Sequence, residues 1–192
     1  MIGAQYGGKM NIYETCPTLE SDRFILRPIR DEDCADLVKV YGDKFALPFF
    51  NSDNCHGDNF YYATEARMRE ALDFWEMSYE NGWFVRLSIE DKTVGCVVGT
   101  VELCLRDSEN VAVLRIDVRS DYEQEPFLYE IAELITPQIP GYFGCEATIT
   151  KAPIYAVERI KALQSFGFTK CDKYLIGENG FAYNGYWERK TN

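Results

Sequence analysis

The sequence predicts a single mixed α/β domain, with a central sheet of about six or seven strands and helices on both faces. Two observations carry this prediction. Between residues 84 and 119, apolar residues alternate with a period of two through three consecutive segments, which is typical of an antiparallel meander. After residue 126 the pattern becomes helix, strand, helix and strand, which predicts a crossover that adds a parallel strand.

One strand and two helices are expected before the meander. Residues 24–30 form the first strand, and Asp31 begins the first helix, because carboxylates favour the positive end of the helix dipole. Thr64 is expected to cap a second helix that ends at Gly82. Residues 45–62 have no clean period and are expected to form a loop with at most a helical turn.

The meander should contain strands at residues 84–90, 94–105 and 111–119, with the last two side by side. Pro126 is expected to begin the third helix, since proline is tolerated in a first helical turn. Residues 137–144 hold two prolines and two glycines, and we expect them to form a loop.

The last part of the chain should complete the sheet. Residues 145–150 are expected to form a strand, and Pro153 begins the last helix. The chain then predicts strands at residues 168–176 and 181–189, joined by a hairpin turn at residues 177–180.

Residues 1–18 are expected to form a tail and residues 19–192 one domain, because no repeat or flexible linker divides the chain. No apolar run approaches the roughly 18 residues of a membrane span. The first eleven residues lack the apolar core of a signal peptide.

The 192 residues carry a formal net charge of −11. This charge argues against nucleic acid and against an anionic membrane surface as partners, because both require a basic face. A cationic partner such as an amine is compatible with it, although solubility alone also explains an acidic surface.

Seven cysteines are scattered along the chain, with no Cys-x-x-Cys pair and a single histidine, so the ligand spacing of a structural zinc site is missing. We expect all of these thiols to be free, as is typical of a cytoplasmic protein. The seven are Cys16, Cys34, Cys55, Cys96, Cys104, Cys145 and Cys171.

Three local strings resemble the GNAT acetyltransferase superfamily over about residues 19–190. Residues 19–28 read LESDRFILRP and resemble the start of the subgroup that acetylates protein N-termini and small amines. Residues 94–99 read VGCVVG and resemble the family's third strand, and residues 163–168 end in the family's Gly-Phe pair. The resemblance implies a GNAT fold, acetyl-CoA as cofactor, and a small amine or a protein N-terminus as acceptor. A homodimer is also compatible with it.

The family's cofactor motif is Arg/Gln-x-x-Gly-x-Gly/Ala, whose backbone N–H groups hold the diphosphate of acetyl-CoA at a helix N-terminus. At residues 123–128 this chain has Glu123 for the basic residue and Pro126 for the first glycine. Because the glutamates add like charge and proline has no N–H, we expect weak acetyl-CoA binding. The resemblance assigns cofactor contacts to Val118, Arg119, Gln124, Phe127 and Leu128.

Three residues are candidates for catalysis. Asp117 lies between two arginines on a central strand and could accept a proton from an incoming ammonium, or it could belong to a paired charge ladder. Glu102 is a second candidate base, or a surface-facing residue of the meander. Tyr155 could replace the tyrosine with which the family protonates the leaving thiolate, or it could be a packing residue.

Cys55 and His56 could suggest a nucleophile and its base, but neighbouring loop residues seldom face each other.

Two functions remain open for this chain. The first is an acetyl-CoA-dependent N-acetyltransferase that acts by direct attack of the amine. The second is a non-catalytic binding or interaction module of the same fold.

Overall fold

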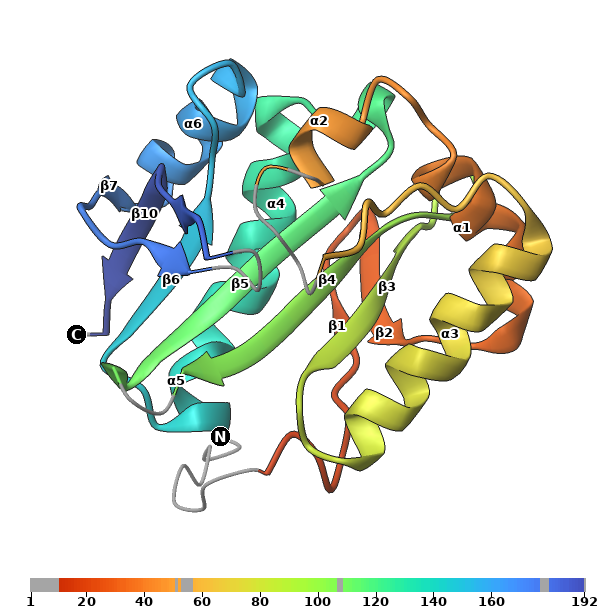
Figure 1. Ribbon diagram of the computed structural model, residues 1–192, viewed down its shortest axis with the longest axis horizontal. Helices are drawn as coiled ribbons and strands as arrows, with labels where there is room; N and C mark the ends of the chain where they lie inside the picture. Colours follow the sequence, from red (N-terminus) through yellow and green to blue (C-terminus); the bar gives the residue numbers. More distant parts are fainter. Residues whose placement is uncertain (1–10, 51, 53–56, 107–108, 177–179, 192) are drawn as a thin grey trace.

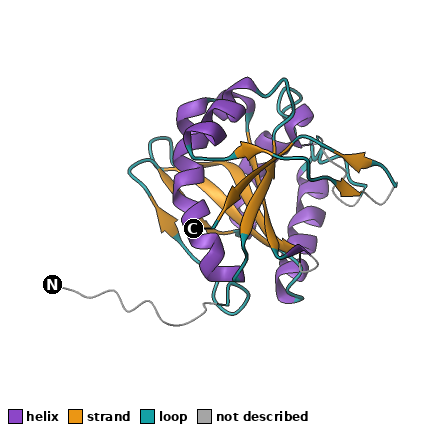
Figure 2. Ribbon diagram, turned by 90° about the vertical axis from the view of Figure 1, so that its left-hand side faces the viewer, coloured by secondary structure: helices purple, strands orange, loops and turns teal. Residues whose placement is uncertain are grey.

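The computed structural model describes residues 11–50, 52, 57–106, 109–176 and 180–191. Its main sheet has eight strands in the order β1-β2-β3-β4-β5-β6-β10-β7, and helices cover both faces of that sheet (Figures 1 and 2). The main strands are β1 (Leu19–Glu20), β2 (Phe24–Pro28), β3 (Val85–Asp91), β4 (Cys96–Arg106), β5 (Val111–Val118), β6 (Ala147–Lys151), β7 (Thr169–Lys170) and β10 (Tyr186–Lys190). Two short strands, β8 (Leu175–Ile176) and β9 (Ala182–Tyr183), pair only with each other.

The helices lie close to where the sequence predicts them, with α5 as an addition, but the last helix begins at Val157 rather than at Pro153. The α-helices are α1 (Cys34–Tyr41), α2 (Leu47–Phe50), α3 (Glu65–Glu80), α4 (Glu125–Ile135), α5 (Ile139–Phe143) and α6 (Val157–Ser165). Short 3-10 turns are η1 (Asp31–Asp33), η3 (Ser120–Tyr122) and η4 (Thr136–Gln138). The Thr64 cap is confirmed, because its hydroxyl accepts a hydrogen bond from the Arg67 backbone N–H at 3.3 Å.

The predicted mixed α/β class and the meander are confirmed. Strands β3, β4 and β5 pair antiparallel, with Leu103 opposite Leu114, and β6 then adds in parallel to β5. The main sheet has eight strands rather than six or seven, because the two-residue strands β1 and β7 extend its edges. Segments this short carry too little periodicity for the sequence to show them.

The expected loop at residues 137–144 is wrong. This stretch is helical in η4 and α5, and it ends at Gly144, which adopts a left-handed φ of 65°. Pro137 and Pro140 each lie in the first turn of a short helical segment, where a missing N–H costs nothing. Burial of Ile139 and Phe143 against the core stabilises the segment.

The continuous strands expected at residues 168–176 and 181–189 are also wrong, because each is divided into two short strands of different sheets. Only Thr169–Lys170 pairs with β10, and the chain then leaves the main sheet to form β8 against β9. Figure 2 shows this small hairpin projecting from the body of the domain. Residues 177–179 of the predicted hairpin turn, like Cys55 and His56, lie outside the described residues.

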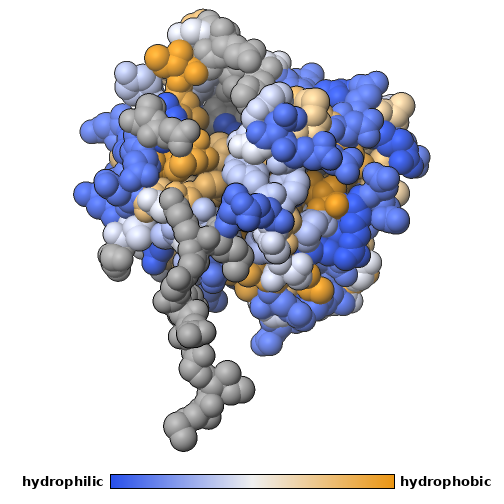
Figure 3. All heavy atoms as spheres, turned by 90° about the horizontal axis from the view of Figure 1, so that it is seen from below, coloured by the Kyte–Doolittle hydropathy of each residue, from blue (hydrophilic) through white to orange (hydrophobic). Residues whose placement is uncertain are grey.

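Each face of the sheet has its own apolar core. Helices α1 and α3 pack together on one face, and α4 and α6 on the other. The face of the molecule in Figure 3 is largely hydrophilic with scattered apolar patches, as in most soluble domains. Among the described residues, no helix is both long enough and apolar enough to cross a bilayer.

The pairing between strands β5 and β6 ends halfway along β5. Their parallel pairing runs from Val111 opposite Ala147 to Leu114 opposite Thr150, whereas β5 continues to Val118 paired with β4 alone. Figure 1 shows the two strands diverging. The second half of β5 therefore lies at the point where the β5–β6 pairing of the main sheet ends.

Close approach of β4 and β5 requires glycine at position 99. A Cβ there would lie 2.3 Å from the Asp117 carbonyl oxygen, which belongs to the backbone and cannot move aside cheaply. We expect Gly99→Ala to lower the free energy of unfolding by about 1–3 kcal/mol in urea titrations. Gly141→Ala is the matched control, because nothing lies within 4 Å of the added carbon in α5, and equal losses in both variants would refute the argument.

The thiols give a second test of the fold. The six cysteines in the described part of the chain are all free. Thiol titration of the denatured, unreduced protein should therefore detect close to seven thiols per chain, counting Cys55. Two or more stable disulfides in protein kept at a cytosol-like redox potential would contradict this expectation.

Candidate functional site

A row of alternating charges crosses the sheet face that α1 and α3 cover. Arg86 on β3 lies opposite Glu102 on β4, which in turn lies opposite Arg115 on β5. Glu102 accepts hydrogen bonds from both guanidinium groups, at 2.5 Å from Arg115 Nη1, and its side chain is 7% exposed. The sheet therefore carries a ladder of paired charges, but this ladder crosses three strands instead of following one strand.

Asp117 lies in the next row of the same sheet face. Arg86 Nη1 is 3.3 Å from Asp117 Oδ2 and 2.7 Å from the Tyr41 hydroxyl. The Tyr41 hydroxyl is also 3.2 Å from Asp117 Oδ2 and 2.7 Å from the Thr100 hydroxyl, which faces Asp117 across the strand pair. The structure thus brings the two predicted carboxylates together around one buried arginine.

The two carboxyl groups differ in their affinity for protons. Burial raises the pKa of Glu102, but the charges of Arg86 and Arg115 outweigh burial and bring it to about 2. Burial raises the pKa of Asp117, and the charge of Glu102 adds to this effect while Arg86 opposes it. Glu102 is therefore held as an anion, and Asp117 is the carboxyl of the pair that more readily carries a proton.

Aromatic side chains from the helical layer cover this network. The Arg86 guanidinium lies 4.3 Å from the centre of the Trp75 ring, and Tyr41 packs against Phe50, Tyr62 and Trp75. This cover removes water from the ion pairs, and their interaction is stronger as a result. It also means that a ligand reaches the Glu102 carboxylate only if aromatic groups move.

Backbone N–H groups of the loop between β5 and α4 donate hydrogen bonds to other groups of the protein. Ser120 N–H donates to Asp43 Oδ2 at 2.8 Å, Glu123 N–H donates to the Ser120 carbonyl at 3.2 Å, and Gln124 N–H donates to the Tyr122 carbonyl at 2.8 Å. These residues lead directly into α4, whose first-turn N–H groups are the ones that an anion at the helix N-terminus would require.

The first turn of α4 continues this pattern. Glu125 N–H faces the Glu158 carboxylate of α6 at 3.5 Å, and the next residue is Pro126, which has no N–H. Lys161 donates to Glu158 at 2.7 Å and lowers the pKa of that carboxyl, so the group facing the helix start is an anion. A protein carboxylate thus lies beside the first N–H group of α4.

Glu123 does not project into solvent, and the expectation that its charge would face a bound diphosphate is wrong. Its two carboxylate oxygens accept hydrogen bonds from Nε and Nη2 of Arg159, each at 2.7 Å. The exposed fractions of the two side chains are only 7% and 8%. This buried bidentate pair neutralises Glu123 and connects the β5–α4 loop to α6.

The five residues assigned to the cofactor lie in three kinds of surroundings. Val118 and Leu128 are buried in the core, and Phe127 packs its ring against Phe24 and Tyr122. Arg119 pairs with Asp121 at 2.6 Å, and the Gln124 side chain donates to the Asp121 carbonyl at 2.7 Å. Only Arg119 and Gln124 offer side-chain polar groups near the loop surface.

Tyr155 lies apart from the two carboxylates, in the segment between β6 and α6. Its hydroxyl donates to the Pro48 carbonyl at 2.7 Å, and its ring centre is 5.8 Å from that of Phe49. Because Pro48 and Phe49 belong to α2, Tyr155 connects this short helix to the segment between β6 and α6. Slightly more than half of its surface remains exposed.

The comparisons with known proteins rest on structure. No family model matches the chain, and no curated protein matches it by sequence. A GNAT-family acetyltransferase from Bacillus anthracis superposes with a TM-score of 0.68 at 11% identity, covering 91% of this chain and 98% of its own. The ribosomal-protein-S5-alanine acetyltransferase of Vibrio fischeri gives 0.69 at 14% identity, covering 91% and 96%.

The ribosomal L7/L12 alpha-N-protein acetyltransferase RimL in complex with coenzyme A gives 0.69 at 9% identity, covering 91% of this chain and 98% of its own. The chain has the fold of the GNAT acetyltransferases. At these identities the likeness concerns the GNAT fold alone, and the chemistry has to be argued from the residues of this chain.

Sequence reasoning missed two buried arginines of this domain, Arg86 and Arg159. Arg86 interrupts an otherwise apolar strand between Val85 and Leu87. Arg159 lies on the helical face that also carries Leu163, an apolar face on which an arginine requires a buried partner. In the described part of the chain, no three His, Cys, Asp or Glu side chains form a metal site.

Glu102 should make stability depend on pH. Its pKa of about 2 lies below the ordinary 4.5, so its stabilising contribution is complete above pH 4.5 and is lost as the pH falls toward 2. Glu102→Gln should lower the free energy of unfolding by about 3 kcal/mol at pH 7, because it removes one partner of a buried pair. The gap between the two proteins should narrow below pH 4.5.

Urea unfolding at pH 7, 4.5 and 3 measures this gap. Glu70→Gln on the exposed side of α3 is the matched control and should leave stability nearly unchanged at each pH. A Glu102→Gln variant as stable as the control at pH 7 would show that the ion pairs contribute little.

Proposed function

We propose that this chain is a GNAT-fold binding module. In this proposal, the start of α4 does not bind the diphosphate of acetyl-CoA, as the resemblance would imply. One observation carries the proposal: most of the backbone positions from Ser120 to Pro126, which lead into the first turn of α4, have no open donor. Glu123 and Gln124 donate to carbonyls of their own loop, Glu125 faces a carboxylate, and Pro126 has no donor.

Charge supports the same conclusion. The Glu158 carboxylate faces the N-terminus of α4, and Glu125 lies in that first turn. Two unit charges of like sign about 4 Å apart near a surface repel by up to ~4 kcal/mol at an effective dielectric constant of 20, and by less in salt. The residues present therefore do not fit a diphosphate at this helix start.

An amine or a protein N-terminus is the partner that best suits this module. The chain has a net charge of −11, so it attracts cations over long range. RimL, which has the same fold, is an alpha-N-protein acetyltransferase, and its partner is thus a protein N-terminus. Binding of such a group does not require the cofactor.

An N-acetyltransferase is the second candidate, and Asp117 favours it. This carboxyl lies on the half of β5 that no longer pairs with β6. Burial raises the pKa of Asp117, so it is a better proton acceptor than an ordinary aspartate. In that function Asp117 would take the proton from the ammonium of the acceptor. Glu102, held as an anion between two arginines, is less suited to the role.

Calorimetric titration with acetyl-CoA separates the two candidates. The module should bind acetyl-CoA with a Kd in the high micromolar range or weaker. The double variant Glu158→Ala with Pro126→Gly removes the carboxylate from the helix start and restores one N–H donor. It should bind acetyl-CoA at least tenfold more tightly than the natural protein does.

Glu133→Ala is the matched control, because it removes one exposed charge from α4 without changing the first turn. Its affinity for acetyl-CoA should equal that of the natural protein within about twofold. Low micromolar binding by the natural protein, together with acetyl transfer to an amine that Asp117→Asn abolishes, would refute the binding-module proposal and establish the enzyme.

A further inference from the structure

The C-terminal end of α3 carries three large apolar side chains that the rest of the domain leaves exposed. Phe74, Met77 and Trp83 have exposed fractions of 42%, 41% and 56%. Another side of the same helix is fully packed, with Met68 and Leu72 at 0% and 5% exposure. Helix α3 therefore has a second apolar surface in addition to the one that packs into the core.

The backbone at the end of α3 holds two of these side chains together. The Gly82 N–H donates to the Tyr79 carbonyl at 3.0 Å, and Gly82 adopts a left-handed φ of 70°. The Trp83 N–H donates to the Ser78 carbonyl at 2.9 Å, which completes a Schellman motif. In this motif the residue at the position of Trp83 commonly makes an apolar contact with the residue at the position of Met77.

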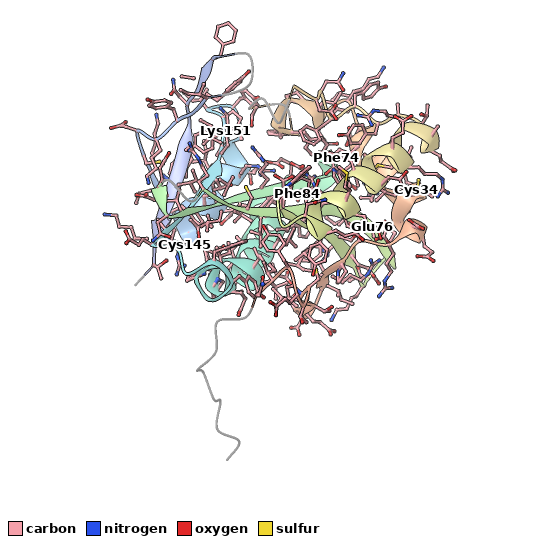
Figure 4. All side chains as sticks on the ribbon, turned by 60° about the horizontal axis from the view of Figure 1, so that its bottom comes forward. Cys34, Phe74, Glu76, Phe84, Cys145 and Lys151 are labelled. Atoms are coloured by element: carbon pink, nitrogen blue, oxygen red, sulfur yellow. The ribbon has the colours of Figure 1, made fainter. Side chains whose placement is uncertain are left out.

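Phe74 extends this surface by one helical turn, because it precedes Met77 by three residues. Its ring centre lies 6.1 Å from that of Phe84, and Figure 4 labels both residues. Phe84 is itself buried, so it supports the Phe74 ring without covering it. Phe74, Met77 and Trp83 thus form one continuous apolar surface, the α3 patch.

The charges beside the α3 patch are acidic. Glu70, Asp73 and Glu80 lie three or four residues from a member of the patch, the spacing at which helix residues are neighbours. All three are exposed, and Asp73 and Glu80 make no ion pair within the described part of the chain. Arg67, about two turns earlier than the patch, is already paired with Asp58 at 2.9 Å. The patch therefore has an apolar centre and an anionic border.

The anionic border decides among the partners that an apolar patch could take. In a symmetric dimer through this patch, the carboxylates of two copies would lie close together, and like charges oppose that contact. An anionic membrane surface is disfavoured for the same reason. A protein segment whose apolar side chains are flanked by lysine or arginine complements both the centre and the border.

We propose that the α3 patch docks a basic amphipathic helix of another protein, with its lysine or arginine side chains beside Asp73 and Glu80. Tryptophan, phenylalanine and methionine are enriched at protein interfaces, and the unbranched Met77 side chain adapts to the shape of its partner. The patch lies on the side of a helix and offers no strand edge, so a partner helix suits it better than an added strand. This inference does not depend on acetyl-CoA or on the proposed function.

Trp83 makes the docking visible in fluorescence. The other two tryptophans, Trp75 and Trp187, are only 4% and 8% exposed. The probe is a synthetic peptide of about 14 residues, with leucine at the i, i+3, i+4 and i+7 positions and lysine elsewhere. Added to the complete protein at about 0.15 M salt, it should shift the emission of Trp83 to shorter wavelengths with a Kd of about 100 μM or below. An unshifted emission would place any binding elsewhere and overturn the proposal.

Two control peptides separate the apolar contact from the attraction between charges. The first has the same composition with its leucines spread around the helix, and the second has glutamate in place of every lysine. Each should bind about tenfold more weakly than the amphipathic basic peptide, or weaker still. Equal binding of the first control would reveal a nonspecific attraction to an acidic protein, and equal binding of the second would remove the role of the border. Either result contradicts the proposal.

Variants of the apolar centre place the peptide on α3. Met77→Ser with Trp83→Ser removes exposed apolar surface and should weaken peptide binding about tenfold or more in calorimetry. Val94→Ser is the matched control, because Val94 is 58% exposed in the turn between β3 and β4 and lies outside the patch. An unchanged affinity in the double variant, or an equal loss in the control, would refute the site.

Variants of the border test its charge without touching the apolar side chains. Asp73→Lys with Glu80→Lys should weaken binding of the basic peptide about tenfold or more. Glu133→Lys with Glu146→Lys changes the net charge equally at two exposed carboxylates outside the patch, and it should cost about twofold or less. Equal losses in the two double variants would show that only the total charge matters, which would refute the border.

The other occupants are tested on the protein without peptide. The emission of Trp83 should not change with protein concentration or with added phosphatidylcholine vesicles. A dimer in sedimentation that Met77→Ser with Trp83→Ser dissociates would assign the patch to a second copy of this chain. A shift to shorter wavelengths with vesicles would assign it to a bilayer, and either outcome overturns the proposal.

Discussion

The Arg86 guanidinium is the charge around which one half of the domain is organised. It is almost fully buried, and it is compensated by Glu102, Asp117 and the Tyr41 hydroxyl. A buried charge without such partners would cost several kcal/mol, so the partners have to be in place whenever the domain is folded. Those partners come from β4, β5 and α1, and the requirement therefore couples the register of the sheet to the position of a helix.

The ion pairs of Arg86 depend on the register in which β3, β4 and β5 pair. Arg86, Glu102 and Arg115 meet only because β3, β4 and β5 pair with these residues opposite one another. A slip by one residue would turn each charge to the opposite face, into the apolar core beneath α4 and α6. The aromatic side chains over Arg86 then exclude water, and this strengthens the ion pairs that hold the register.

A second buried pair, Glu123 with Arg159, connects this half to the other face of the sheet. Asp117 lies close enough to Arg159 for the two charges to affect each other's pKa, so the end of β5 lies between two arginines. The same pair draws the β5–α4 loop toward α6. The position of the loop and the compensation of the Glu123 charge therefore depend on the same ion pair.

Much of the architecture followed from local patterns in the sequence. The period-two segments of the meander, the Thr64 cap of α3 and the crossover around β6 depend on residues close together in the chain, and the structure confirms them. The GNAT resemblance followed from the same short strings. Asp117 and Glu102 were also found from sequence, because charges inside an apolar strand stand out.

Tertiary structure alone decided what those charges do. The partner of Glu123 lies 36 residues away in α6, and the partners of Arg86 lie 16 and 31 residues away on other strands. Helical packing of residues 137–144 depends on the core that they meet, and the break after β7 depends on where β10 stops pairing. Sequence patterns report which side chains share a face, whereas the identity of the opposing group, and with it the protonation of each carboxyl, depends on how distant segments pair in space.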